Sequence, residues 1–90
     1  MAGFERLIES VLAYPVRTDI RYADVERLLL RLGFEIQRNS GSHRRFHRLI
    51  LERRVTVLLT EQKELPFYQV KQVADMIKKY FPELMAREGN

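Results

Sequence analysis

Apolar residues recur with the spacing of an amphipathic helix in the first third of the chain. In the first segment they fall three and four positions apart, at Phe4, Leu7, Ile8, Val11 and Leu12. The pattern is repeated from about Tyr22 to Leu32, and Gly33 is placed to cap that segment because glycine adopts left-handed backbone angles at little cost. We therefore expect one helix that ends before Pro15 and a second that ends at Gly33.

After Gly33 apolar residues recur at every second position instead of every third or fourth, which predicts three strands. Their segments are Phe34–Gln37, His43–Ile50 and Arg54–Thr60. Turn-forming residues at 39–42 and charged residues at 52–54 separate the segments, so we expect a meander of antiparallel strands.

Alternation along the second strand divides its side chains between two faces. Phe46 and Ile50 would face the core, and the opposite face would carry His43, Arg45 and His47. That second face stays uncovered if the helices all pack on the first.

A last helix is predicted between Pro66 and Pro82. Its buried stripe would be Val70, Val73, Ala74 and Ile77. Residues 83–90 are expected to form a flexible tail. The order α-α-β-β-β-α predicts an α+β domain with a three-stranded antiparallel sheet and helices on one face.

The composition narrows the class of protein. A chain of 90 residues makes one domain, and no apolar run approaches the ~20 residues that cross a bilayer. There is no cysteine, which excludes disulfides and thiolate metal sites. The first residues lack the basic and apolar regions of a signal peptide, so we expect a cytoplasmic protein that does not enter a membrane.

Positive charge is concentrated in one central segment. Residues 38–54 contain six arginines and one acidic residue, whereas the segments before and after it are close to neutral. The planar guanidinium group of arginine suits phosphate, so the segment predicts an anion-binding surface. The alternative interpretation is a solvated strand edge that resists aggregation.

Both histidines of the chain lie in this segment, at positions 43 and 47. Four residues on a strand span ~13 Å. The two imidazoles therefore cannot readily converge on one zinc ion, which needs bonds of ~2 Å, or flank one phosphorus atom. We expect no metal site and no cofactor.

A single histidine can still act as a general acid or base, because imidazole titrates near neutral pH. RNA supplies its own nucleophile, the 2′-hydroxyl, so a protein that removes this proton and holds the phosphate can cleave RNA. His43 follows a glycine turn at a strand start, where it should be exposed and fixed. The cations expected to neutralise phosphates are Arg44, Arg45, Arg48 and Lys63. The alternative is an exposed histidine without a catalytic role.

The other candidates have open interpretations. His47 would contact RNA or a protein, or be only a surface residue. Tyr68 would either stack on a base or pack on the sheet, and Phe46 is expected in the core rather than as a stacking platform.

At Gly41-Ser42-His43-Arg44-Arg45-Phe46 the chain resembles the HicA family of bacterial toxins, the mRNA interferases. That family has a helix, a Gly-Phe pair and a strand before Gly-Ser-His-x-x-Phe, and Leu32-Gly33-Phe34 stands here at a fitting distance. Tyr68-Gln69-Val70-Lys71-Gln72 resembles the Tyr-Gln-Val-Arg-Gln of a longer HicA-like subgroup, which tends to carry an extra N-terminal helix. The resemblance covers about residues 22–80.

The resemblance implies a fold like a double-stranded-RNA-binding domain. It implies a single HicA-like domain over residues 1–90, with about 1–15 as the extra helix, 22–81 as the core and 83–90 as the tail. It also implies metal-independent cleavage of mRNA with His43 as the catalytic residue, and inhibition by a cognate HicB-type antitoxin that covers the active face. The residues expected to contact RNA are Arg38, Ser42, Arg44, Arg45, His47, Arg48, Lys63, Tyr68 and Lys71.

Two other functions fit the same residues. A non-catalytic RNA-binding module would use the arginine face without needing His43. A protein-interaction domain would dock an acidic partner on that face.

Overall fold

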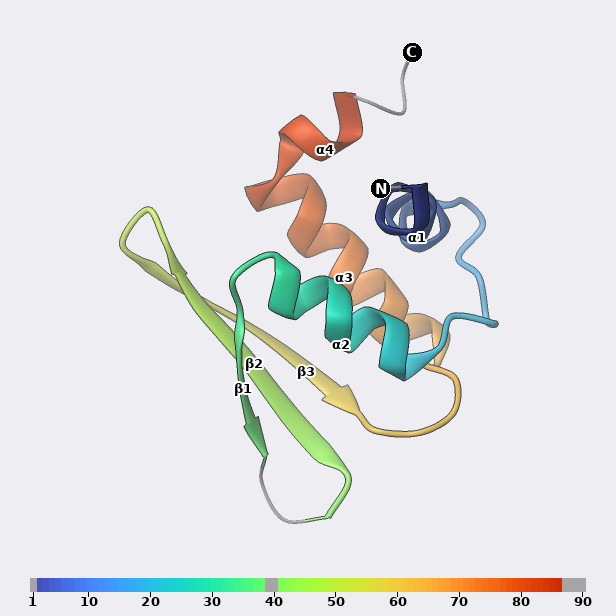
Figure 1. Cartoon of the computed structure of the whole chain (residues 1–90), viewed down its shortest axis with the longest axis horizontal. Helices are drawn as coiled ribbons and strands as arrows, with labels where there is room; N and C mark the ends of the chain where they lie inside the picture. Colours follow the sequence, from blue (N-terminus) through green and yellow to red (C-terminus); the bar gives the residue numbers. More distant parts are fainter. Residues whose placement is uncertain (1, 39–40, 87–90) are drawn as a thin grey trace.

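The computed structural model describes residues 2–38 and 41–86 and begins with two helices (Figure 1). α1 spans Ala2–Leu12 and α2 spans Tyr22–Arg31. Both predicted apolar stripes face inward, because the stripe residues are buried or packed against the core. Residues 39 and 40 of the predicted turn and residues 87–90 of the predicted tail lie outside the described residues.

α2 ends in a glycine cap, as its sequence predicts. Gly33 has a φ of 90°, and its N–H donates to the carbonyl of Leu30 at 3.0 Å. The N–H of Phe34 donates to the carbonyl of Leu29, also at 3.0 Å, which completes a Schellman motif. Leu29 and Phe34 are both buried, so this cap directs the chain from α2 straight into the first strand.

Three strands form the predicted meander in the order β1-β2-β3. β1 spans Glu35–Arg38, β2 spans His43–Ile50 and β3 spans Arg53–Thr60, with antiparallel pairing throughout. The second turn was predicted at residues 52–54, but it consists of Leu51 and Glu52. Their φ angles of 52° and 65° are those of a type I′ hairpin, which leucine and glutamate do not signal in a sequence.

α3 spans Phe67–Tyr80, directly after Pro66, and its predicted apolar stripe is buried. Pro82 does not lead into a flexible tail, because α4 spans Pro82–Ala86. The prediction of a tail over residues 83–86 is therefore wrong. Proline suits the first position of a helix, and Leu84 packs against the core, which together hold this last turn in place.

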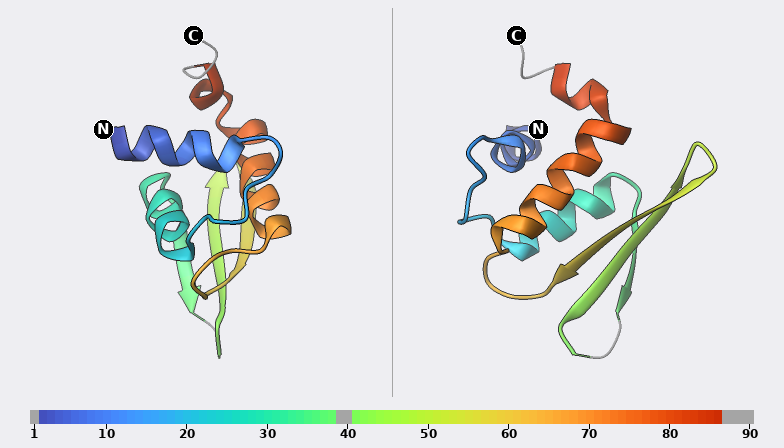
Figure 2. Two further views of the ribbon diagram at one scale, coloured as in Figure 1. Left: turned by 90° about the vertical axis from the view of Figure 1, so that its right-hand side faces the viewer. Right: turned by 180° about the vertical axis from the view of Figure 1, so that it is seen from behind.

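The helices all lie on one side of the sheet, and α2 and α3 form the layer that covers it (Figures 1 and 2). α2 packs against β1 and α3 against β3, while α1 lies against α2 and α3 on their side away from the sheet. Phe46 of β2 is fully buried between the layers, as predicted. The α+β class with a three-stranded antiparallel sheet is confirmed, and the arrangement is consistent with a double-stranded-RNA-binding domain. Within residues 2–38 and 41–86, no helix is long and apolar enough to cross a membrane.

Two glutamines of α3 close part of the outer edge of β3. The side-chain amide of Gln72 donates to the carbonyl of Leu58 and accepts from its N–H, each at 2.9 Å. Gln69 accepts from the N–H of Thr60 and donates to the Thr60 hydroxyl, each at 3.1 Å. Because an edge strand presents unpaired backbone groups, these amides satisfy the edge and fix the start of α3 beside the end of β3.

Candidate functional site on the open face of the sheet

The sheet face turned away from the helices carries the central candidates. Residues paired across the strands point to the same face, so the register defines its rows. From one end to the other these rows are His43 with Thr60, Gln37 with Arg45 and Leu58, Glu35 with His47 and Thr56, and Leu49 with Arg54. The predicted placement of His43, Arg45 and His47 on one face is confirmed.

A surface hollow of ≈ 390 Å³ lies at the His43 end of the sheet. Residues of β2, β3 and the start of α3 line it, namely His43, Arg44, Arg45, Leu58, Leu59, Thr60, Tyr68 and Gln69. The His43 and Arg45 side chains are exposed at its border. The hollow therefore brings together groups that can exchange a proton and neutralise a phosphate.

Two exposed aromatic rings stand at the same end of the molecule. Tyr68 is 60% exposed and Phe67 is 57% exposed, and their rings meet edge to face with centroids 6.0 Å apart. Tyr68 therefore lies exposed beside the end of the sheet, and stacking on a base and packing on the sheet both stay predictions. An exposed ring next to a cationic hollow can stack on a nucleobase.

His47 lies away from this hollow. It is half-buried and lines a separate depression of ≈ 350 Å³ with Glu35, Arg48 and Arg54 among the neighbouring residues. The two histidines thus belong to different places on the sheet, as the strand spacing predicted. In the described part of the chain, no group of three or more His, Asp or Glu side chains could hold a metal ion.

Strand alternation divides five of the six arginines of residues 38–54 into two sets, and the sixth, Arg53, is exposed next to the β2–β3 turn. Arg45 and Arg54 lie on the open face with the histidines. Arg38, Arg44 and Arg48 lie in the alternate register, on the side of the helices, where each has partners within the protein. Composition alone did not separate these sets, because it counts charge without direction.

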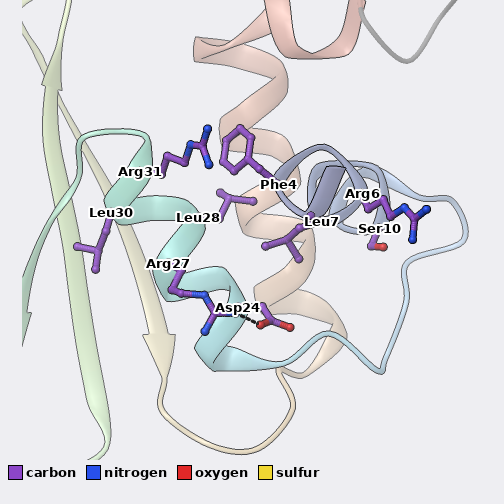
Figure 3. A pocket seen from close by; sticks show the side chains of 10 residues that line it. Phe4, Arg6, Leu7, Ser10, Asp24, Arg27, Leu28, Leu30 and Arg31 are labelled. Atoms are coloured by element: carbon purple, nitrogen blue, oxygen red, sulfur yellow. Dashed lines mark hydrogen bonds and ion pairs between the residues drawn. The ribbon is translucent and has the colours of Figure 1, made fainter. Parts of the chain in front are cut away.

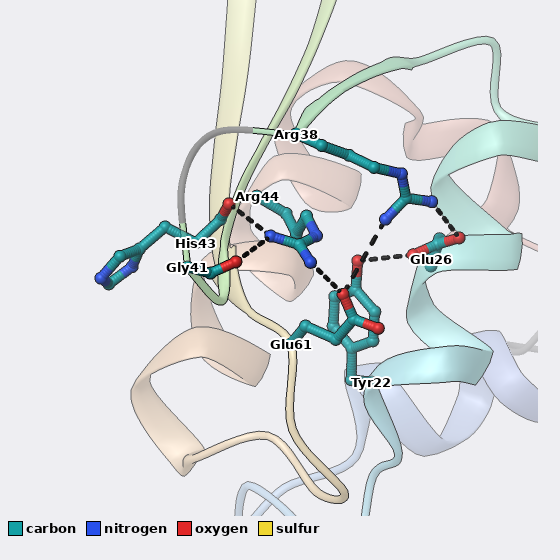
Figure 4. A network of polar contacts seen from close by, with 7 residues as sticks. All are labelled: Tyr22, Glu26, Arg38, Gly41, His43, Arg44 and Glu61. Carbon is teal, nitrogen blue, oxygen red and sulfur yellow. Dashed lines mark hydrogen bonds and ion pairs between the residues drawn. The ribbon is translucent and has the colours of Figure 1, made fainter.

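Arg44 hydrogen-bonds to the backbone at and before His43 (Figure 4). Its guanidinium group donates to the carbonyls of Gly41 and His43 at 2.8 and 2.9 Å, and it pairs with the Glu61 carboxylate at 2.6 Å. The N–H of Glu61 in turn donates to the carbonyl of Ser42 at 2.7 Å. The side chain of Arg44 is only 14% exposed, so these bonds fix the end of the turn before β2 from the side of the sheet that faces the helices.

The network continues from Glu61 to α2. Arg38 lies 3.8 Å from Glu61 and 3.4 Å from Glu26, and the hydroxyl of Tyr22 donates to Glu26 at 2.5 Å. Burial of Tyr22 raises the pKa of its hydroxyl, and the bond to the Glu26 carboxylate raises it further. The turn that carries His43 is thus tied to the first turns of α2 by a chain of polar side chains (Figure 4).

Arg48 joins β2 to the end of α2. Its guanidinium group donates to the carbonyl of Leu32 and lies over the ring of Phe81, 5.6 Å from the ring centroid. A Cβ atom at Gly33 would come within 3.3 Å of this guanidinium group. Arg48 therefore binds the C-terminal end of α2, and it lines the depression of His47 and not the hollow of His43.

The remaining predicted contacts are dispersed. Ser42 and Lys63 are exposed in loops, and Lys71 on α3 pairs with Asp75 at 3.0 Å. None of these three residues lines the His43 hollow. RNA contacts by them stay a prediction.

Sequence reasoning missed Glu61, Thr60 and Phe67. Glu61 gave no signal, because an acidic residue after a strand is typical of a loop. Thr60 could have been placed beside His43 if the hairpin register had been known. The tandem aromatic residues Phe67 and Tyr68 directly after Pro66 were a signal, since the first turn of a helix is rarely buried all round.

Comparison with known proteins adds one finding. The family described as HicA toxin of bacterial toxin-antitoxin matches residues 22–79, from the first residue of α2 to the penultimate residue of α3. Neither a curated protein nor a solved structure gives a significant match. The family match spans well over half of the chain and includes the turn of His43 and the whole sheet, whereas α1 and α4 lie outside it. The chain therefore belongs to the HicA family of toxins from bacterial toxin–antitoxin systems.

Proposed function

We propose that this HicA-family toxin is an endoribonuclease that cleaves mRNA without a metal ion. HicA toxins are known as mRNA interferases, which supports a nuclease at the level of the family. The observation that carries the proposal is the hollow at the end of the sheet, which His43, Arg45 and Tyr68 line. These three side chains supply a base, a phosphate contact and a stacking surface.

In the proposed reaction His43 removes the proton of a ribose 2′-hydroxyl. The 2′-oxygen attacks the adjacent phosphorus, the bond from phosphorus to the 5′-oxygen breaks, and that oxygen takes a proton. The products are a 2′,3′-cyclic phosphate and a 5′-hydroxyl end. Arg45 would stabilise the negative charge that develops on the phosphorus oxygens.

Arg44 and Arg38 have a different role in this proposal. Their guanidinium groups already bind Glu61 and Glu26 on the side of the helices. We assign them to positioning the His43 turn instead of the phosphate contacts expected from sequence. We assign the phosphate contact to Arg45, which lies on the open face and lines the His43 hollow.

The test is incubation of the purified protein, free of any partner, with mRNA in EDTA. Wild type should cleave, and His43→Ala should lose at least ~100-fold in rate, the usual contribution of a general base. His47→Ala is the matched control and should retain most of the rate, because His47 lines a separate depression. Equal cleavage by wild type and His43→Ala would contradict His43 as the general base. Cleavage by wild type that occurs without EDTA but stops when EDTA is added would contradict a metal-independent reaction.

HicA-family toxins work with an antitoxin partner, and we propose a HicB-type protein that covers the open face in the cytoplasm. Its surface there should be acidic, because the exposed Arg45 and Arg54 lie on this face. A non-catalytic RNA-binding module would instead bind RNA with the same salt dependence in wild type and His43→Ala, and cleave in neither.

A further inference from the structure

A second surface lies on the far side of the helices from His43. A groove of ≈ 770 Å³ is formed between α1 and α2 (Figure 3). Phe4, Leu7 and Leu28 converge between the two helices and form its apolar part. α1 precedes the matched residues 22–79, so this groove is a feature that α1 adds to the family core.

The border of the groove is basic. Arg6, Arg27 and Arg31 line it against one acidic residue, Asp24, which Arg27 pairs with at 2.5 Å. The guanidinium group of Arg31 lies over the ring of Phe4, 4.3 Å from the ring centroid. This leaves cationic groups on both helices beside an apolar floor, and an acidic partner would complement them.

The shape of the groove favours a helix as its occupant. Its lining runs from Gly3 to Ser10 on α1 and from Asp24 to Arg31 on α2, which is about two helical turns, or ~10 Å, on each helix. A third helix laid against two others can insert side chains spaced i, i+3 or i+4 and i+7. The space beside Gly3 at the edge of the groove is open, because a Cβ atom there would meet nothing within 4 Å.

We propose that this α1–α2 groove binds an acidic amphipathic helix of a partner protein. The partner helix places leucine-like side chains between α1 and α2 against Leu7 and Leu28, and its glutamate or aspartate residues face Arg6 and Arg31. Because α1 lies on the side of the helices away from the sheet, the bound helix leaves the His43 face free.

The probe is a fluorescent synthetic peptide of about 15 residues, with leucines on one helical face and glutamates on the others, measured by anisotropy. A peptide of the same composition with scrambled leucine positions is its control. Wild type should bind the amphipathic peptide saturably, more weakly at high salt, and should bind the scrambled peptide at least tenfold less well. Equal affinity for both peptides, or no saturable binding, would overturn the proposal.

Variants locate the site. Gly3→Trp fills the mouth of the groove and should weaken binding at least tenfold, while Gly3→Ala, which only raises helix propensity, should bind as wild type. The double change Arg6→Glu with Arg31→Glu should also abolish binding, whereas the exposed Arg53→Glu at the β2–β3 hairpin should not. Circular dichroism of each variant shows whether it is folded, and unchanged affinity in a folded Gly3→Trp variant contradicts the proposal.

Other occupants give different results. A dimer in sedimentation that disappears in Gly3→Trp would show that a second copy of the chain fills the groove, and binding of laurate without peptide would show a small-molecule site. Either outcome overturns the peptide proposal. His43→Ala should bind the peptide as wild type, so this test is independent of RNA cleavage.

Discussion

Arg44 and Arg45 are neighbours in sequence, but strand alternation gives them different surroundings. Arg44 lies on the side of the helices and bonds to Gly41, His43 and Glu61. Arg45 lies on the open face beside Leu58 and lines the hollow of His43. At the scale of single residues, one guanidinium group thus stabilises the turn while the next is exposed on the open face.

Substitution of each arginine by methionine separates these roles. Arg44→Met should lower the free energy of unfolding by about 1–3 kcal/mol, because charged hydrogen bonds are lost and Glu61 is left without this partner. Arg45→Met should change stability by less than about 0.5 kcal/mol, since an exposed side chain away from the core is removed. Urea denaturation followed by circular dichroism measures both.

RNA binding should show the opposite order. Arg45→Met should reduce the slope of log affinity against log salt by about 1, the signature of one lost phosphate contact. Arg44→Met, measured without urea under conditions where it is folded, should keep the wild-type slope of log affinity against log salt. If Arg44→Met reduces this slope and leaves stability unchanged, Arg44 contacts a phosphate and does not stabilise the turn.

The β2–β3 hairpin shows strain at the scale of an element. Leu51 and Glu52 both have left-handed backbone angles, and Leu51 is 90% exposed. Residues other than glycine and asparagine lose roughly 1 kcal/mol in this conformation. The hairpin therefore keeps its register from strand pairing and from the core face, not from its turn residues.

Leu51→Asn combined with Glu52→Gly should stabilise the protein by about 1 kcal/mol, because Asn-Gly is the preferred type I′ sequence. The pair Leu51→Ala with Glu52→Ala is the matched control, since it removes both side chains without favouring left-handed angles. Thermal unfolding measures the difference. If both pairs raise the melting temperature equally, the gain comes from removing the exposed leucine and not from the backbone.

The glutamines of α3 give a second prediction for an element. Gln69→Leu should cost about 1–3 kcal/mol, because Gln69 is buried and its loss leaves the N–H of Thr60 without its partner. Gln72→Leu should cost less, since Gln72 is only partly buried and water can replace it at Leu58. Amide hydrogen exchange should quicken at Thr60 in the first variant and at Leu58 in the second. No change at these amides would contradict the proposed closure of the edge.

The sequence predicts elements well where one physical signal dominates. Periodicity gave the stripes of α1, α2 and α3, Gly33 gave the end of α2, and alternation gave the face of His43. Elements with a weak or ambiguous local signal were not predicted: the turn at Leu51 and Glu52 depends on strand register, and α4 begins at a proline that also suits a helix end and depends on the packing of Leu84.

The candidate site follows the same division. His43 and Arg45 could be placed on one face from the spacing alone, whereas the partners of Arg38 and Arg44 could not. Glu26 and Glu61 come from segments distant in sequence, and only the folded chain brings them to these arginines. Charge patterning therefore overestimated the number of arginines available for phosphate.

At the scale of the whole molecule, the Tyr22 network makes stability depend on pH. The pKa of Tyr22 is raised in the folded state, first by burial and then by the bond to Glu26. The folded protein thus prefers the neutral hydroxyl. This contribution is fully present below the unfolded-state pKa of ~10 and is lost as the pH rises towards the raised folded-state value.

Tyr22→Phe tests this dependence. At pH 7 it should lower the free energy of unfolding by about 1 kcal/mol, the net value of the lost hydrogen bond. Above pH ~10 the Tyr22 hydroxyl ionises in the unfolded chain but stays neutral in the folded protein, which favours unfolding of wild type. The stability advantage of wild type over Tyr22→Phe should therefore shrink and then reverse. Tyr14→Phe is the control, because Tyr14 is 94% exposed and its removal should leave the pH profile of wild type. Parallel stability curves for wild type and Tyr22→Phe from pH 7 to above ~10 would show that the hydroxyl of Tyr22 does not couple the network to folding.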